Sequence, residues 1–174
     1  MRNLFIIGMM GSWKSTVGLK LAEAMSMKFV DTDDSIEEVT KMKISDIFTE
    51  FGEDRFREME TAFFIEKAKQ TGHVFSTGGG IVLKPENRKT LKKYGTTFFL
   101  NATIKTLADR LHNTQKRPLL TESDNVTMCL EKIWEERRNY YKSSSHHTID
   151  TNNLSPEQVL DEILNLLKVP FENH

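Results

Sequence analysis

A short apolar run that stops at a glycine is the feature that most constrains the fold of this chain. Residues 4–7 read LFII, and they are followed by GMMGSWKST at 8–16 and by a helical pattern that reaches about Met27. A continuously apolar run before a glycine predicts a buried strand, and the pattern after Lys14 predicts an amphipathic helix. Strand, glycine loop and helix in this order direct backbone N–H groups and the positive end of a helix at one point, which favours phosphate binding.

The loop departs at one position from the phosphate-binding pattern G-x-x-x-x-G-K-[ST]. Gly8, Lys14 and Ser15 have the required spacing, but Trp13 stands where the pattern has its second glycine. The Lys14 ammonium can neutralise phosphate charge, and the Ser15 hydroxyl can ligate Mg²⁺. The alternative is a chance Gly/Ser turn before a helix.

Trp13 creates two difficulties for such a loop. If the loop needs a positive φ at this position, a non-glycine residue costs about 1–2 kcal/mol. The indole also needs space, and the nearest space is the phosphate site. We therefore expect the loop either to strain around Trp13 or to relax away from the phosphates, with nucleotide affinity weaker by at least about tenfold.

Two acids close the second predicted strand, residues 28–33. Asp31 and Asp33 are alternate residues of an extended segment, so their side chains should point to one side, at the edge of the sheet where ligands bind. One carboxylate can hold Mg²⁺, and the other can accept hydrogen bonds from a hydroxylated substrate. The alternatives are solvated turn residues or a helix cap formed by Asp34, with Glu37 three residues later.

Residues 35–70 are predicted to form successive helices, with Gly52 as the expected break. Arg57 and Glu60 lie one helical turn apart in this region, and a surface ion pair would also explain them. STGGG at 76–80 follows another predicted strand. Three glycines in a row indicate a close approach of the backbone to another group, or else a flexible turn.

The rest of the chain continues the alternation of strands and helices. Expected in order are a strand at 95–102, a helix at 103–112, a polar lid at 113–125, a helix at 126–144, a strand at 146–150 and a helix at 155–169. This alternation predicts an α/β domain with a mainly parallel sheet. The lid should be mobile until ligands bind, and Ser155 should cap the last helix.

Composition limits the function classes. The chain has 174 residues, the size of one domain (1–174), and its formal net charge of -1 gives no basic field for nucleic acid or an anionic membrane. Cys129 is the only cysteine, which excludes an internal disulfide and fits a reducing cytosol. The five histidines lack the spacing of metal ligands, and no apolar run approaches transmembrane length. We expect a cytoplasmic monomer.

Taken together, the motifs resemble the shikimate kinase family. They are, in order, GMMGSxKST, DTD, DIF followed by FRxxE, STGGG, RPLL and ERRxYY, and they extend over nearly the whole chain. The resemblance implies a three-layer P-loop kinase fold, with a five-stranded parallel sheet in the order 2-3-1-4-5 and a lid. It also implies Mg²⁺-dependent phosphoryl transfer from ATP to the 3-hydroxyl of shikimate, in aromatic amino acid biosynthesis.

The resemblance also implies roles for single residues. Lys14, Asp33 and Arg117 are the implied catalytic residues, with Asp33 as the base and Arg117 arriving with the lid. Ser15 and Asp31 would serve Mg²⁺. The implied substrate site, which includes a helical region at about 33–61, consists of Asp33, Arg57, Gly78, Gly79, Gly80 and Arg137. The implied nucleotide site consists of Gly11, Ser12, Trp13, Lys14, Ser15, Thr16, Arg110 and Arg117.

Within these sets, the resemblance gives the arginines different partners. Arg57 and Arg137 would bind the substrate carboxylate, which suits the bidentate geometry of guanidinium, and Glu60 would orient Arg57. Arg110 would cover the adenine. Two other functions stay open: a catalytically silent shikimate-binding protein, and another small-molecule kinase such as a gluconate kinase. The lid arginine favours an enzyme over a silent binding protein. The paired carboxylate-binding arginines count against a kinase such as a gluconate kinase.

Overall fold

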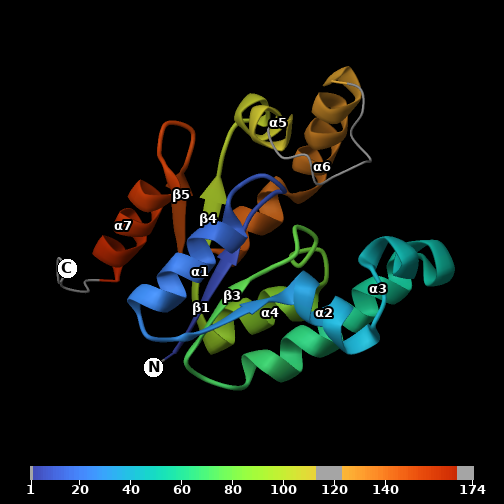
Figure 1. The fold of residues 1–174 in the computed structure, drawn as a ribbon, viewed down its shortest axis with the longest axis horizontal. Helices are drawn as coiled ribbons and strands as arrows, with labels where there is room; N and C mark the ends of the chain where they lie inside the picture. Colours follow the sequence, from blue (N-terminus) through green and yellow to red (C-terminus); the bar gives the residue numbers. More distant parts are fainter. Residues whose placement is uncertain (1, 113–122, 168–174) are drawn as a thin grey trace.

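The computed structural model describes residues 2–112 and 123–167, which form three layers with a sheet between two sets of helices (Figure 1). The described strands form one five-stranded sheet in the order β2-β3-β1-β4-β5, and all four pairings are parallel. The predicted fold is therefore confirmed. The strands are β1 (Asn3–Ile7), β2 (Lys28–Asp31), β3 (His73–Ser76), β4 (Gly95–Asn101) and β5 (His147–Asp150).

Helices connect successive strands on both faces of the sheet. They are α1 (Lys14–Ala24), α2 (Thr32–Thr40), α3 (Ile44–Ala68), α4 (Pro85–Tyr94), α5 (Ile104–His112), α6 (Ser123–Ser144) and α7 (Pro156–Leu166). The predicted lid at 113–125, with Arg117, lies almost wholly outside the described residues. Among the described helices, none is long and apolar enough to cross a membrane.

The alternation of side chains along β1 divides the core in two. Phe5 and Ile7 face a cluster that includes side chains of α3, α4 and α6, here called the α3–α4–α6 core. Leu4 and Ile6 face a cluster with side chains of α1 and α7, here called the α1–α7 core. All four of these side chains are buried, so the continuous apolar run reflects a strand covered on both faces.

The central position of β1 also determines where ligands can bind. Because the strands are parallel, the segments after β1, β2 and β3 all emerge at one edge of the sheet. These segments are the loop 8–13, the start of α2 and the glycine loop 77–80. The sequence motifs from three separate regions therefore meet at this edge.

Two predicted boundaries were wrong in the acidic region. Strand β2 ends at Asp31, and α2 already begins at Thr32, so Asp31 and Asp33 are not alternate residues of one strand. The helix cap is Asp31 rather than Asp34, because the Asp31 side chain accepts hydrogen bonds from the N–H groups of Asp33 and Asp34. The predicted break at Gly52 is confirmed by its non-helical φ of 81° within α3.

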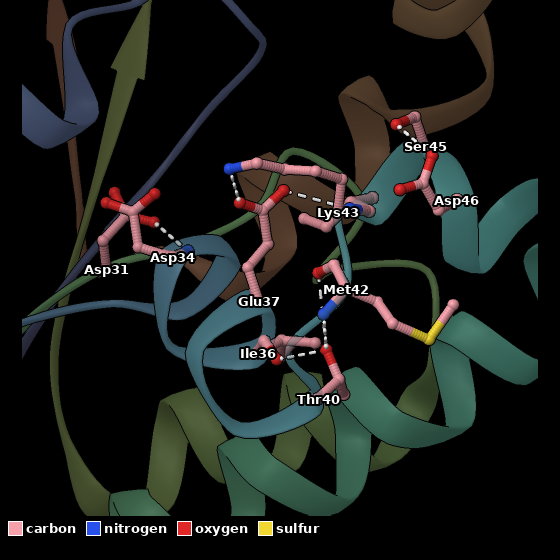
Figure 2. Close-up of polar contacts among 10 residues, drawn as sticks. Asp31, Asp34, Ile36, Glu37, Thr40, Met42, Lys43, Ser45 and Asp46 are labelled. Atoms are coloured by element: carbon pink, nitrogen blue, oxygen red, sulfur yellow. Dashed lines mark hydrogen bonds and ion pairs between the residues drawn. The ribbon is translucent and has the colours of Figure 1, made fainter.

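Helix α2 and helix α3 meet in a turn that the sequence pattern did not predict. Lys41 has a left-handed conformation with φ 59°, which ends α2. Figure 2 shows how Glu37 stabilises this turn. Its carboxylate accepts hydrogen bonds from Lys43 Nζ (2.6 Å) and from the N–H of Ile44 (3.0 Å). Glu37 therefore stabilises the start of α3 instead of completing a capping box with Asp34.

Candidate active site

The loop between β1 and α1 keeps a tight, left-handed course. Gly8, Gly11 and Trp13 all have positive φ values, of 151°, 79° and 67°. A side chain at Gly8 would also place its Cβ 2.7 Å from the carbonyl oxygen of Leu100, which glycine alone avoids. Of the two outcomes expected for Trp13, the structure has the strained one, because the tryptophan adopts a conformation that normally favours glycine.

The indole of Trp13 does not enter the space that the sequence predicted. It lies against the guanidinium of Arg110, with the guanidinium carbon 3.4 Å from the ring centroid. It also packs against the α1–α7 core. Arg110 donates hydrogen bonds to the hydroxyl (3.1 Å) and to the carbonyl oxygen of Thr151. Trp13 and Arg110 thus form a stack beside the loop.

The residues after Trp13 place a cation and two oxygen ligands close together. Lys14 Nζ donates to the carbonyl oxygen of Met9 (2.9 Å), which holds the lysine across the loop. The Ser15 hydroxyl donates to Asp31 Oδ2 (2.6 Å), and the hydroxyl of Ser76 lies 3.1 Å from it. Asp31 therefore uses one oxygen toward α1 and the other as the cap of α2.

A cavity of about 310 Å³ opens at this edge of the sheet, a volume within the usual range for small-ligand pockets. It brings together most of the predicted catalytic, metal and substrate residues. Those that line it are Lys14, Ser15, Asp31, Asp33, Arg57, Gly78, Gly79, Gly80 and Arg137. The predicted nucleotide residues Gly11, Ser12, Trp13, Thr16 and Arg110 are not among the described residues of the cavity wall. Ser12 is buried and Thr16 is exposed.

Arg57 is held in the cavity wall by two carboxylates and two aromatic rings. Its Nη1 donates to Glu60 (2.8 Å), and its Nε and Nη2 donate to Glu53 (3.2 and 3.0 Å). Phe48 and Phe56 place their rings 5.9 and 5.0 Å from the guanidinium carbon. These contacts use three of the five N–H donors of arginine. Glu60 was predicted to orient Arg57, whereas Glu53 was missed.

Glu60 is completely buried. Burial raises the pKa of its carboxyl, although the positive charge of Arg57 opposes this shift. Its Oε1 has no hydrogen-bond partner among the described residues and lies close to Gly78, on the side where Asp33 Oδ1 also lies. Two acidic side chains therefore flank the first glycine of the GGG loop.

The GGG loop has a steric reason for two of its glycines. A Cβ at Gly78 would come within 2.6 Å of Asp33 Oδ1 and 2.7 Å of Glu60 Oε1. A Cβ at Gly80 would overlap the guanidinium of Arg57, whereas one at Gly79 would meet no atom closer than 3.6 Å. The close approach predicted for this loop is thus an approach to the side chains of Asp33, Arg57 and Glu60, and the alternative of a merely flexible turn does not account for it.

Two further residues fix the loop, and the sequence reasoning gave neither a role. The N–H of Gly78 donates to the hydroxyl of Thr32 (2.9 Å), and the Tyr141 hydroxyl donates to the carbonyl oxygen of Gly79 (2.5 Å). Burial raises the pKa of Tyr141 to about 12, despite the nearby positive charge of Arg137. Tyr141 thus remains a hydrogen-bond donor. Its only sequence signal is its place in the ERRxYY motif.

Arg137 lies one helical turn before Tyr141 on α6 and reaches the same cavity. Its side chain is 12% exposed, and Glu136 Oε2 lies 3.7 Å from its Nε. This Nε has no hydrogen-bond partner among the described residues. A buried guanidinium in such a wall offers donors to a bound anion.

The oxygen atoms of Ser15 and Asp31 fit a Mg²⁺ ion that takes most of its ligands from elsewhere. Mg²⁺ commonly binds through one or two protein oxygens and completes an octahedron with water and phosphate. Among the described residues, no group of three or more His, Cys, Asp or Glu side chains could form a protein cage for a metal. The hydroxyl–carboxylate pair beside Lys14 is the arrangement that suits a phosphate-bound ion.

A parallel sheet with a lysine-bearing loop after its central strand, and a cavity lined by two arginines beside that loop, is typical of a phosphate-binding-loop protein of the small-molecule kinase class. Comparison with known proteins narrows this class. The family model for shikimate kinase matches residues 10–168. The chain belongs to the shikimate kinase family.

Individual relatives agree with this assignment over nearly the whole chain. A shikimate kinase of Sulfurihydrogenibium sp. (strain YO3AOP1) is 42% identical over 168 residues, which cover 97% of this chain and 99% of the relative. A shikimate kinase of Rippkaea orientalis is 44% identical over 162 residues, covering 93% and 86%. The solved structure of a shikimate kinase from Acinetobacter baumannii in complex with shikimate is 33% identical, has a TM-score of 0.89, and covers 97% of this chain and 93% of that one.

Proposed function

We propose that this protein transfers the γ-phosphoryl group of ATP to the 3-hydroxyl of shikimate, giving ADP and shikimate 3-phosphate in aromatic amino acid biosynthesis. One observation carries the proposal: a single cavity contains the loop lysine, the acid Asp33 and the two arginines Arg57 and Arg137. A phosphoryl donor and a carboxylate-bearing alcohol could therefore meet there. The shikimate named in the complex of the Acinetobacter baumannii relative has both a carboxylate and hydroxyl groups, which supports this choice.

The proposed reaction needs a base and an orienting clamp. Arg57 and Arg137 bind the substrate carboxylate, and this leaves a hydroxyl near Asp33. The hydroxyl oxygen forms a bond to the γ-phosphorus while the bond from that phosphorus to the ADP oxygen breaks. The hydroxyl proton passes to the Asp33 carboxylate and then to solvent. The backbone of Asp33 is fixed by the hydrogen bond from its own N–H to Asp31 Oδ1 (3.1 Å), which holds the proposed base in position.

Charge neutralisation is the other requirement of phosphoryl transfer. Lys14 faces the β- and γ-phosphates, and N–H groups of residues 11–16 surround the remaining phosphate oxygens. When bound by Ser15 and Asp31, Mg²⁺ would neutralise charge on the β- and γ-phosphates. The proposed lid arginine, Arg117, lies outside the described residues. We also propose that Trp13 weakens nucleotide binding, and that the protein acts as a cytoplasmic monomer.

A coupled assay of ADP release tests the proposal. The protein with ATP and Mg²⁺ should release ADP faster when shikimate is added, and Asp33→Asn should remove this stimulation. Asp34→Asn is the matched control, because Asp34 is the neighbouring acid of the same helix and has no assigned part in the transfer. ADP release that does not depend on shikimate, in this chain and in Trp13→Gly, would refute the proposal.

A further inference from the structure

The arrangement of the site leaves one direction for the nucleoside part of the phosphoryl donor. The cavity wall includes Asp33 of α2 and Arg57 of α3. These two helices lie on the side of the loop next to β2 and β3 (Figure 1). A triphosphate with its terminal group in this cavity runs along the loop and leaves it on the opposite side. That side is formed by α5 and by the turn after β5. With the triphosphate along the loop in this direction, the base would come close to Arg110 and Thr151.

An aromatic ring of this chain already lies there. The indole of Trp13 is stacked on Arg110 at 3.4 Å, a distance typical of direct contact between two flat groups. Arg110 cannot easily move away from it. Its hydrogen bonds go to Thr151, which is itself buried and whose N–H donates to the carbonyl oxygen of Asn101 at the end of β4 (2.8 Å). The indole is thus held against a guanidinium that is anchored to the sheet.

The backbone of Trp13 has a strained conformation, and the contacts around it must hold it in place. A tryptophan with φ 67° is unfavourable and persists only where the surroundings fix it. These contacts include the Arg110 stack, the packing against the α1–α7 core, and the hydrogen bond from the N–H of Val17 to the carbonyl oxygen of Trp13 (2.9 Å). An indole is a flat, two-ring group of nearly purine size, so it uses the stacking surface that a purine base would use.

We propose that Trp13 occupies the nucleobase position on Arg110, so that a nucleotide must displace the indole before its base can stack. Trp13 then opposes the base and leaves the phosphate cradle largely intact, and it sets the base affinity and base preference of this site. The proposal rests on the proposed function, because it assumes that the phosphoryl donor is a nucleoside triphosphate.

Comparing a donor that has a base with one that lacks it tests this proposal. Binding of ATP and of inorganic tripolyphosphate, each with Mg²⁺, is measured by calorimetry for the unaltered protein, Trp13→Phe and Trp13→Gly. We expect Trp13→Gly to bind ATP at least about tenfold more tightly and tripolyphosphate within about threefold of the unaltered protein. Trp13→Phe, with its smaller ring, should give an intermediate gain for ATP.

Fluorescence gives a second measurement. Trp134 is the only other tryptophan, so the emission of Trp134→Phe reports Trp13 alone. ATP should change this emission strongly as the indole leaves Arg110, and tripolyphosphate should change it little. Thermal unfolding of each variant verifies that it is folded.

Two results would overturn the proposal. Equal gains for ATP and tripolyphosphate in Trp13→Gly would show that the tryptophan disturbs the phosphate cradle. Weaker ATP binding in Trp13→Gly, with affinity retained in Trp13→Phe, would show that the ring supports the base. Shikimate-dependent ADP release is measured separately. Tight ATP binding without such release would refute the proposed function. The affinities for ATP and for tripolyphosphate would still decide the role of Trp13.

Discussion

The carbon atom that a side chain would add at Gly80 falls on the guanidinium of Arg57. Arg57 cannot yield freely, because Glu53 and Glu60 hold it from two sides and Phe56 lies 5.0 Å from its guanidinium carbon. A residue with no catalytic group of its own therefore determines whether the arginine can occupy its place in the cavity.

Gly80→Ala should accordingly weaken shikimate binding by displacing Arg57. Breaking one or two of its charged hydrogen bonds predicts a loss on the order of 1.5–3 kcal/mol, or about tenfold or more in affinity. Gly79→Ala is the matched control, since its Cβ would meet no atom closer than 3.6 Å, and it should lose much less. Calorimetric titration with shikimate checks both variants. Equal losses would contradict the steric explanation.

Arg137 and Arg138 are adjacent in sequence but differ in environment. Arg137 is 12% exposed in the cavity wall, whereas Arg138 is 45% exposed and pairs with Glu135 (3.0 Å). Arg137→Ala should weaken shikimate binding by about 2–4 kcal/mol, because it removes a charged donor from an enclosed site. Arg138→Ala should change the affinity little, as is usual for an exposed ion pair. If both variants bind shikimate like the unaltered protein, Arg137 does not contact the carboxylate.

At the scale of secondary-structure elements, the turn between α2 and α3 contributes to the stability of the fold and also positions part of the cavity wall. Glu37 holds Lys43 and the N–H of Ile44, and Ile44 and Phe48 line the cavity wall near the start of α3. The hydrogen bond from Lys43 lowers the pKa of Glu37, helped by the one from Ile44. The carboxylate is therefore ionised in its structural role at neutral pH.

Glu37→Ala should lower the free energy of unfolding by about 1 kcal/mol, since it removes a charge-assisted hydrogen bond and leaves an N–H group without its partner. It should also raise the KM for shikimate, because the start of α3 loosens. The exposed neighbour Glu38 provides the matched control, Glu38→Ala. Denaturant unfolding and steady-state kinetics measure the two effects. A stability loss of the same size in both variants would contradict the prediction that Glu37 stabilises the turn between α2 and α3.

Strand β3 contains a histidine whose protonation should oppose folding. His73 is 5% exposed, and burial lowers the pKa of its imidazole, as do the positive charges of Lys67 and Lys28. The unfolded chain therefore binds this proton more tightly than the folded protein, and stability should fall as the pH drops below about 6.5. Urea unfolding at pH 7.5 and 5.5 should show a smaller pH effect in His73→Leu than in the unaltered protein. Substitution of the exposed His112 is the control for the loss of a histidine.

Some of these elements could be read from the sequence and others could not. LFII, the helix after Lys14 and the cap of α7 follow local rules, and Ser155 and Gln158 form the reciprocal capping box that such rules describe. Helix α4 was missed because it is strongly hydrophilic, although Pro85 at its first turn was a usable signal.

The site shows a similar division. Ordered motifs indicated Arg57, Arg137 and the glycines as site residues, and these residues line one cavity. Their positions there depend on contacts between distant segments. Thr32 was overlooked because, in a strand, its side chain would point away from those of Asp31 and Asp33. In the structure Thr32 belongs to α2, and its hydroxyl accepts the hydrogen bond from the N–H of Gly78. The direction of the Trp13 indole depends on Arg110, which is far away in sequence, and so no local rule could give it.

At the scale of the whole molecule, one sheet separates the α3–α4–α6 core from the α1–α7 core, and the cavity lies at the edge that both share. A ligand bound there should therefore stabilise the protein as a whole. At about 100 times its Kd, shikimate should add about 2.7 kcal/mol and raise the unfolding midpoint by roughly 5–10 °C. Arg137→Ala should lose most of this shift at the same concentration, as should a neutral polyol in place of shikimate. Calorimetric scanning measures the midpoints, and an unchanged midpoint with shikimate would contradict the assignment of the cavity.

Asp31 accepts hydrogen bonds with both of its oxygen atoms, one from Ser15 at the start of α1 and one from the N–H of Asp33. Thermal displacement of α2 therefore moves the proposed metal ligand and the proposed base together, and the fluctuations of the two groups are correlated. The distance between the Asp31 carboxylate, which is the proposed metal ligand, and the Asp33 carboxylate, which is the proposed base, then varies less than the position of either group. Replacing Asp31 by Glu, which is one methylene longer, would alter that spacing even if both hydrogen bonds formed again.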